Sequence, residues 1–287
     1  MWYNKKSKYL EVHMDYGQHT RSVPLLGEDG LSKLQNAKVA VFGVGGVGGH
    51  LCEALARAGV GELHLFDKDT VSLTNINRQA VALHSTVGLP KVEVMRARIA
   101  DINPDCRVFA HQVFYTPETA DEYDLSAYDY VADAIDTIGA KVELICRAKA
   151  AGTPIICAMG AGNKLDPSAF RIADLSKTQV CPLAKIMRRE LGARGIKHLT
   201  VVYSEEKPQP SRLPAEYGKH VPASLSFVPS AMGLIMAGKI VCDLTDTHAQ
   251  FGKTQSYKGH SDPNALFPFF RNYLPLTNNC TNSMIYL

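Results

Sequence analysis

A glycine-rich loop between two apolar runs constrains the fold of this chain more than any other feature. Residues 38–69 read "KVAVFGVGGVGGHLCEALARAGVGELHLFDKD". A β-branched apolar run leads into the loop, and a helix-like segment and a second apolar run follow it and end at two aspartates. The glycines are Gly43, Gly45, Gly46, Gly48 and Gly49. Because glycine lacks a Cβ atom, such a turn lets the backbone approach a phosphate closely.

Strands and helices alternate over the first 160 residues. The patterns predict strands at 38–43, 62–67, 106–112, 128–136 and 154–162, and helices at 27–37, 48–60, 91–103 and 138–152. This alternation predicts an α/β fold with a doubly wound, mostly parallel, Rossmann-like sheet. Ligands of such sheets bind at the carboxyl ends of the strands. The glycines, Asp67, Asp69 and Asp136 all fall at such ends.

The periodicity loosens after residue 160. We expect a helix at 181–196, a strand at 201–206, a loop rich in proline and charge at 207–222, and a helix at 228–244. The apolar stretch 225–244 contains Pro229, Lys239 and Asp243. We therefore interpret it as a buried or subunit-interface helix rather than a membrane span. The tail from residue 250 shows no clear periodicity.

Composition and cysteine usage narrow the class of protein. The 287 residues with 46% hydrophobic content can bury a large core, and a net charge of +3 does not by itself indicate a nucleic-acid binder. No N-terminal segment has the pattern of a secretory leader. The seven cysteines are scattered, odd in number and form no CxxC pair. This favours reduced thiols in a cytoplasmic protein, and we expect no structural zinc.

The glycine spacing indicates a nucleotide but does not identify it. Gly43-x-Gly45-x-x-Gly48 fits the fingerprint of dinucleotide-binding folds, and Asp67 follows about 20 residues later, where a ribose hydroxyl is held. The same arrangement suits the dinucleotide of a hydride-transfer enzyme and the triphosphate of ATP. The choice between them depends on the residues that follow.

Those residues favour a polyphosphate. Polar side chains come within a dozen residues of Asp67, namely Asn75, Asn77, Arg78 and Gln79. Lys91 opens the next helix, and arginine and lysine supply the charge that phosphate oxygens require. Asp136 is suited to hold the Mg²⁺ that accompanies a triphosphate. Each also has a structural interpretation: Arg78 as a surface charge, Lys91 as a solvated lysine and Asp136 as a helix cap.

Together these segments resemble the superfamily of ubiquitin-activating and ThiF/MoeB enzymes, which adenylate a carboxylate with ATP. The matching segments are "GVGGVG", "FDKDTVSLTNINRQ", "VGLPKVE", "INPDCRV" and "DAIDT". The resemblance implies that Asp67 binds ribose and that Asp136 binds Mg²⁺. It implies that Arg78 and Lys91 bind the phosphates. The other residues expected to contact the nucleotide, besides the glycines, are Asp69, Asn75 and Gln79.

The resemblance also implies a homodimer. Arg21, in "HTRSVPLLGEDGL", resembles the arginine that family members lend to the phosphates of the partner subunit. The alternative is a surface arginine on a loose arm.

Downstream segments indicate one branch of the superfamily. ThiF and MoeB usually carry two CxxC pairs that hold zinc, and ubiquitin-activating enzymes add a catalytic-cysteine domain, for which this chain is too short. The segments "GAGNKLDPSAFRIADLSKTQVCPLAKIMRRELGARGI", "VVYSEEKP" and "SFVPSAMGLIMAGKIV" resemble the TcdA (CsdL) branch of tRNA threonylcarbamoyladenosine dehydratases. That branch uses ATP to close the threonyl carboxylate of the modified adenosine in tRNA into a ring.

This resemblance predicts the domain organisation. We expect one adenylating domain at 15–249, with a nucleotide-binding core at 38–160. The half at 161–249 would continue the sheet and supply substrate contacts and a dimer interface. The tail at 250–287 stays unassigned. The sequence leaves open whether a monovalent cation or sulfur-transfer proteins bind.

A basic stripe is the candidate tRNA surface. Residues 177–197 contain a single acid, Glu190, and six basic side chains: Lys177, Lys185, Arg188, Arg189, Arg194 and Lys197. Such a stripe can neutralise phosphates, although a solvated helix face is the structural alternative. Cys181 begins this basic helix. We interpret Cys181 as structural, because a nucleophile already present in the substrate requires no protein thiol.

Three other functions compete with this interpretation. An adenylyltransferase for a ubiquitin-like sulfur carrier protein is the first alternative, and the missing CxxC pairs count against it. An NAD-linked oxidoreductase does not need Arg78 and Lys91. A non-catalytic binding module would not need the intact polar set.

Overall fold

The structure is a computed structural model, and it describes residues 16–210 and 222–247. The chain divides into two compact units, Met1–Phe251 and Gly252–Leu287, and all described residues belong to the first. The unassigned tail and most of the loop expected at 207–222 therefore lie outside the described residues. The domain boundaries expected from the sequence stay predictions.

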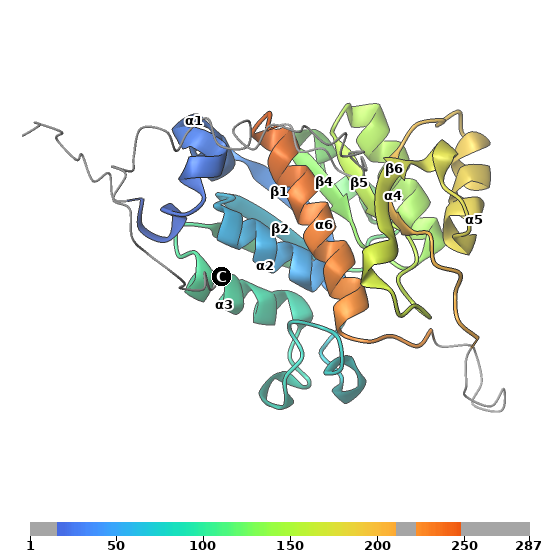
Figure 1. Cartoon of the computed structure of the whole chain (residues 1–287), viewed down its shortest axis with the longest axis horizontal. Coiled ribbons are helices and arrows are strands. Elements are labelled where there is room, and N and C mark those ends of the chain that lie inside the picture. The colour runs from blue at the N-terminus through green and yellow to red at the C-terminus, as the bar shows by residue number, and fades with distance from the viewer. Residues whose placement is uncertain (1–15, 211–221, 248–287) are drawn as a thin grey trace, which may run out of the picture. The chain divides into compact units, whose positions relative to one another are not determined.

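A mostly parallel sheet forms the centre of the first unit (Figure 1). Within the described residues its order is β3-β2-β1-β4-β5-β7-β6, and only β6 runs antiparallel, against β7. The strands are β1 Lys38–Phe42, β2 Glu62–Phe66, β3 Arg107–His111, β4 Tyr130–Asp133, β5 Ile155–Ala158, β6 Phe170–Asp174 and β7 Thr200–Ser204. The chain reverses direction across the sheet between β1 and β4. This confirms the doubly wound, Rossmann-like fold and the continuation of the sheet by the second half.

Helices cover both faces of the sheet. They are α1 Val23–Asn36, α2 Gly48–Ala58, α3 Lys91–Ile102, α4 Ile138–Ala151, α5 Pro182–Gly192 and α6 Phe227–Leu244. Figure 1 shows α2, α3 and α6 side by side on one face. The core accordingly has two parts. One contains Leu51, Met95 and Met232 of these helices, and the other contains Leu144 of α4 and Met187 of α5.

Helix α6 is a core helix with one outward side. Val228, Met232, Met236 and Ile240 recur every four residues and are fully buried. A Cβ atom on Gly233 would lie 2.4 Å from the Val47 carbonyl oxygen, so glycine is needed for this close packing against α2. By length and composition alone α6 could cross a membrane. Its packing against α2 and the sheet accounts for the apolar residues of its buried side.

Several boundaries and one strand differ from the sequence prediction. The strand expected at 154–162 ends at Ala158, and the helix expected at 181–196 ends at Gly192. Gly27 has φ 73° and ψ 168°, which breaks α1, so the helix expected at 27–37 is the part after this break. The strand expected at 128–136 ends at Asp133, three residues before Asp136. β6 was not predicted. It is a partly buried edge strand with a weak apolar pattern, and its pairing with β7 defines it.

A candidate nucleotide site at the carboxyl ends of the strands

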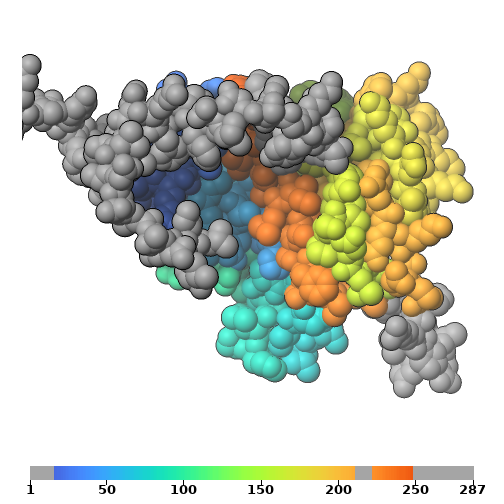
Figure 2. All heavy atoms as spheres, viewed as in Figure 1, coloured from blue at the N-terminus to red at the C-terminus, as the bar shows by residue number. Residues whose placement is uncertain are grey.

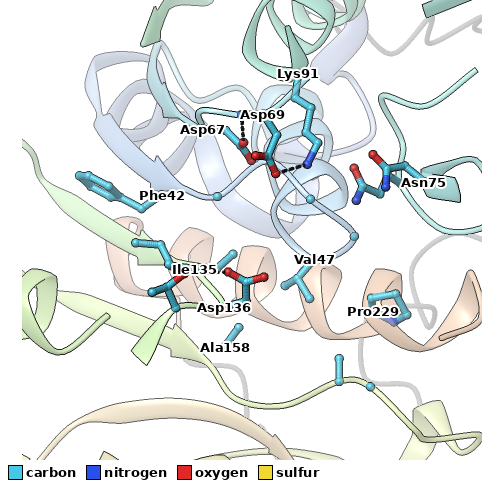
Figure 3. Close-up of a pocket in the computed structure, with 18 of the residues that line it drawn as sticks. Phe42, Val47, Asp67, Asp69, Asn75, Lys91, Ile135, Asp136, Ala158 and Pro229 are labelled. Atoms are coloured by element: carbon cyan, nitrogen blue, oxygen red, sulfur yellow. Dashed lines mark hydrogen bonds and ion pairs between the residues drawn. The ribbon is translucent and has the colours of Figure 1, made fainter. Parts of the chain in front are cut away.

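A cleft of about 790 Å³ opens at the carboxyl ends of the central strands (Figure 3). Its walls come from the glycine loop, the ends of β1, β2, β4 and β5, the segment after β3, and the beginnings of α5 and α6. It brings together most of the sequence-predicted nucleotide residues, namely Gly43, Gly45, Gly46, Asp67, Asp69, Asn75, Arg78, Gln79, Lys91 and Asp136. Gly48 and Arg21 are not part of this lining.

The shape of the glycine loop requires glycine at two positions, because a side chain would not fit at either of them. Gly43 has φ 92°, and a Cβ atom there would lie 2.6 Å from the Ala134 carbonyl oxygen. A Cβ atom on Gly48 would lie 1.8 Å from the Gly43 carbonyl oxygen. Helix α2 begins directly after the loop, and among the described residues no side chain caps its N-terminus at Val47. Its first amide groups therefore suit an anion in the cleft.

Asp67 fixes the glycine loop to the end of β2. One carboxylate oxygen accepts a hydrogen bond from the Val44 amide at 2.7 Å, and the other accepts from the Asp69 amide at 2.9 Å. Each oxygen keeps a further lone pair that can accept from a ribose hydroxyl. The structure therefore shows that Asp67 holds the glycine loop in place. Its carboxylate could accept a ribose hydroxyl as well, so the predicted ribose contact stays a prediction.

Lys91 holds a positive charge at the cleft. Its ammonium lies 2.9 Å from a carboxylate oxygen of Asp69, and its side chain is only 7% exposed, whereas that of Asp69 is 52% exposed. The Lys91 amide also donates to the Asp69 carbonyl at 3.0 Å. Figure 3 shows this pair facing the same space as Asp136. Lys91 is thus not the solvated lysine of the structural alternative.

The turn at 75–79 presents the remaining polar groups. The Asn75 carbonyl accepts from the amides of Arg78 and Gln79, at 3.0 and 2.9 Å, and its side chain accepts from the Ser72 amide at 3.1 Å. Gln79 is buried, and within the described residues its side-chain oxygen has no hydrogen-bond partner. An unpaired buried acceptor beside the glycine loop indicates that a donor belongs there.

Asp136 follows β4 and lies exposed at the cleft. One of its oxygens accepts a hydrogen bond from the Thr137 hydroxyl at 3.3 Å. The neighbouring Asp133, at the strand end itself, is fully buried and pairs with the fully buried Lys141 at 2.7 Å. The burial of Lys141 was not predicted, because lysine side chains are almost never fully buried unless they are paired.

An aromatic wall at one side of the cleft was also missed. Phe42 and Phe66 stack with ring centroids 4.3 Å apart, and Tyr115 meets Phe42 edge-on at 4.9 Å. The Lys68 ammonium lies 3.8 Å from the centroid of the exposed Phe114 ring. Phe42 and Phe66 end strands that the sequence predicted only as buried runs, and Phe114 and Tyr115 lie beyond the end of β3.

Arg21 lies on the side of the sheet where the parallel strands begin, opposite the cleft at their carboxyl ends. The arm that carries it packs on helix ends: a Cβ atom on Gly59, the C-cap of α2, would lie 3.1 Å from the His19 ring. Gln18 donates at 3.0 Å to Asn103, the C-cap of α3. Both helices run from the cleft toward that opposite side. Arg21 is exposed there, away from the cleft of its own chain.

Some basic side chains of the stripe pair with neighbouring groups, and others have no acidic partner among the described residues. Arg188 is half-buried and donates to the carbonyl oxygen of Thr178 at 2.9 Å. Arg189 and Arg194 both pair with Glu190, and their hydrogen bonds lower the pKa of that carboxyl. Three exposed lysines have no acidic partner among the described residues: Lys177, Lys185 and Lys197. Cys181 is buried at the N-cap of α5.

Comparison with known proteins decides the family. The sequence profile of the ThiF family matches residues 16–280. This chain belongs to the ThiF family. The resemblance found in the sequence is thereby confirmed.

Relatives within the family differ in how much of the chain they match. The tRNA threonylcarbamoyladenosine dehydratase of Bacillus subtilis is 48% identical over 239 residues, which are 79% of this chain and 94% of that protein. The solved structure of the Escherichia coli dehydratase in complex with ATP has a TM-score of 0.74 at 33% identity, covering 80% of this chain and 94% of that one. The molybdopterin-synthase adenylyltransferase of E. coli is 36% identical over 147 residues, 48% of this chain and 56% of that protein.

Proposed function

We propose that this ThiF-family chain is an ATP-dependent tRNA threonylcarbamoyladenosine dehydratase. One observation carries the proposal: similarity to the B. subtilis dehydratase extends over 94% of that protein, so it includes the second half as well as the nucleotide core. The cleft adds the chemistry, because its lining combines the glycine loop with the cationic side chains of Arg78 and Lys91 and the carboxylate of Asp136. The solved E. coli relative holds ATP.

The reaction follows from the poor reactivity of a free carboxylate. A substrate carboxylate oxygen attacks the α-phosphorus of ATP, the bond to the β-phosphate breaks, and pyrophosphate leaves. A nucleophile within the substrate then attacks the activated carbonyl carbon and loses a proton, and AMP leaves with the former carboxylate oxygen. The nucleoside has lost one water. Lys91 and Arg78 stabilise the negative charge that develops on the phosphates.

Asp136 is the proposed Mg²⁺ ligand. Proteins usually bind Mg²⁺ through one or two carboxylates together with substrate phosphates. An exposed carboxylate at the cleft, with one weak hydrogen bond from Thr137, fits that requirement. The ion would neutralise charge on the triphosphate. We assign no residue to a monovalent cation.

A homodimer would complete the site. Arg21 lies at the far edge from its own cleft, so it could act only on the cleft of a partner. The outward side of α6, visible at the surface in Figure 2, carries the exposed Phe227 and Leu234, and Leu25 of α1 is also exposed. Exposed apolar side chains of this kind favour a second copy as the partner. No surface is assigned to sulfur-transfer proteins, and a cytoplasmic location stays part of the proposal.

The proposed tRNA contacts are the three lysines without an acidic partner among the described residues, Lys177, Lys185 and Lys197. Reversing charge at Lys177 and Lys185 should weaken tRNA binding and reduce the slope of log affinity against log salt by about 2, because phosphate contacts release counterions. ATP affinity should not change. The measurement is a salt titration of tRNA binding, with the Lys177→Arg, Lys185→Arg double variant as the matched control. Equal slopes for the glutamate and arginine variants would remove this surface.

Arg188 is a poor position for the same test. Its guanidinium holds the Thr178 carbonyl, so charge reversal there would disturb the start of α5 as well as any tRNA contact. The original stripe of six residues therefore reduces to fewer direct candidates.

The alternative is an adenylyltransferase for a sulfur carrier protein. Similarity to the E. coli molybdopterin-synthase adenylyltransferase covers only about half of each protein, which supports it less. AMP release separates the two functions. We expect AMP from Mg-ATP only with threonylcarbamoyl-modified tRNA, and none with unmodified tRNA or with a carrier protein ending in Gly-Gly. Pyrophosphate release driven by the carrier protein would favour the alternative.

A further inference from the structure

A chain of hydrogen bonds links Arg78 to the wall of the cleft formed by the segment before α6. The Arg78 guanidinium donates to the Asn77 side-chain oxygen at 2.8 Å and to the Thr74 carbonyl at 3.0 Å. The same Asn77 amide donates through its nitrogen to the Ser224 carbonyl at 2.9 Å. Asn77 thus uses both ends of its amide, which fixes the amide orientation and the acceptor that faces Arg78.

Asn163 holds the same segment from the other side. The Asn163 side-chain oxygen accepts a hydrogen bond from the Ala223 backbone amide at 2.7 Å, and the Asn163 backbone amide donates to the Ala223 carbonyl at 2.7 Å. Its carbonyl also accepts from the Gln209 amide at 2.7 Å. Asn163 has φ 58°, in the left-handed region, where asparagine is better tolerated than most residues. In this conformation both the side chain and the backbone amide of Asn163 form hydrogen bonds with Ala223.

The segment held between the two asparagines faces the ligand space. Pro222 and Ser224 line the cleft, as does Gly162, the residue before Asn163. A Cβ atom on Gly162 would lie 2.6 Å from the Pro222 Cβ, so the two residues pack closely there. Neither Asn77 nor Asn163 lines the cleft. Any effect of these two side chains on ATP must therefore pass through other groups.

We propose that Asn77 and Asn163 are positioning residues that hold the Arg78 guanidinium toward the phosphates of ATP through the segment Pro222–Ser224. The inference rests on the proposed function, because it assumes that Arg78 acts on ATP. Asn163 fixes the segment, the Ser224 carbonyl fixes Asn77, and Asn77 fixes Arg78. The segment before α6 is thereby joined to Arg78 through Asn77, by one hydrogen bond at each end of the Asn77 amide.

The test is a mutant cycle on ATP binding, measured by calorimetry without tRNA. Asn77→Ala should weaken ATP binding roughly tenfold, the size expected for a charge-assisted hydrogen bond. Asn163→Gly should weaken it by a smaller factor, about threefold, because it acts two contacts away. Glycine keeps the left-handed backbone and removes only the side-chain acceptor. Asn163→Asp, which retains that acceptor, should restore wild-type affinity.

The decisive comparison repeats both substitutions in the Arg78→Ala background. There neither Asn77→Ala nor Asn163→Gly should reduce ATP affinity further, because the group they position is gone. A purely structural role would persist in that background and would overturn the proposal, as would wild-type affinity in both single variants. Asn36→Ala is the control and should change nothing, because Asn36 is exposed and, among the described residues, its side chain bonds only the Ser32 carbonyl.

Failure of this proposal is distinguishable from failure of the proposed function. A wild-type protein that binds no ATP would contradict both. Normal ATP binding with additive effects in the cycle would reject the positioning role and leave the dehydratase proposal untouched.

Discussion

Asp136→Asn is expected to lower the rate of ATP-dependent dehydration by about 10²- to 10³-fold, the range seen when one group that stabilises transition-state charge is removed. The substitution keeps the shape of the side chain and removes the charge proposed to hold Mg²⁺. The carboxylate is exposed, and within the described residues its side-chain hydrogen bond is a long one from Thr137, at 3.3 Å. The free energy of unfolding should therefore change by less than about 0.5 kcal/mol.

Single-turnover rates at several Mg²⁺ concentrations test this expectation. Raising Mg²⁺ should recover part of the lost rate if the lost group is a metal ligand. Asp105→Asn is the matched control, because Asp105 is an exposed carboxylate just before β3, at the opposite edge of the sheet. An Asp136→Asn protein as active as the control would exclude the carboxylate from the reaction.

Lys141→Met is expected to lower the free energy of unfolding by about 3–5 kcal/mol, the usual effect of leaving one partner of a buried ion pair alone. Lys141 and Asp133 are both fully buried, 2.7 Å apart. The other Asp133 oxygen accepts from the Ile135 amide at 3.1 Å, in the turn that leads to Asp136. Removing the lysine would leave the Asp133 carboxylate charged and without a cation in the core.

Urea unfolding of the single and double variants provides the measurement. Asp133→Leu combined with Lys141→Met should recover much of the lost stability, since replacing both charges with apolar groups is often nearly neutral. The double variant should still lose activity, because the Ile135 amide then has no acceptor to hold the turn before Asp136. A single variant within about 1 kcal/mol of wild type would show that the pair is not a desolvated ion pair.

Much of the fold could be read from the sequence because the strands bury β-branched runs and the helices follow them at regular spacing. The parallel order and the position of the cleft follow from that alternation. β6 was missed because it is a partly buried edge strand. The end of β4 was placed too late, since "DAID" continues the apolar pattern beyond the last ladder pair at Asp133.

Site residues that belong to a local sequence motif could be predicted. Residues whose role depends on a partner far away in the sequence could not. The glycines, Asp67 and Lys91 stand at fixed positions around a strand–helix unit, and the cleft gathers them. Burial of Lys141 depends on Asp133. The engagement of Arg188 depends on Thr178. Sequence spacing shows charge but not the partner that neutralises it.

The central claim is tested most directly by the mass of the modified nucleoside. Threonylcarbamoyl-modified tRNA is incubated with the protein and Mg-ATP, digested gently so that a labile ring survives, and its nucleosides are examined by mass spectrometry. We predict the loss of one water from the modified nucleoside, dependent on ATP and absent with Asp136→Ala or Arg78→Ala. An unchanged mass with a protein that binds ATP would contradict the dehydratase function and favour adenylation of a carrier protein.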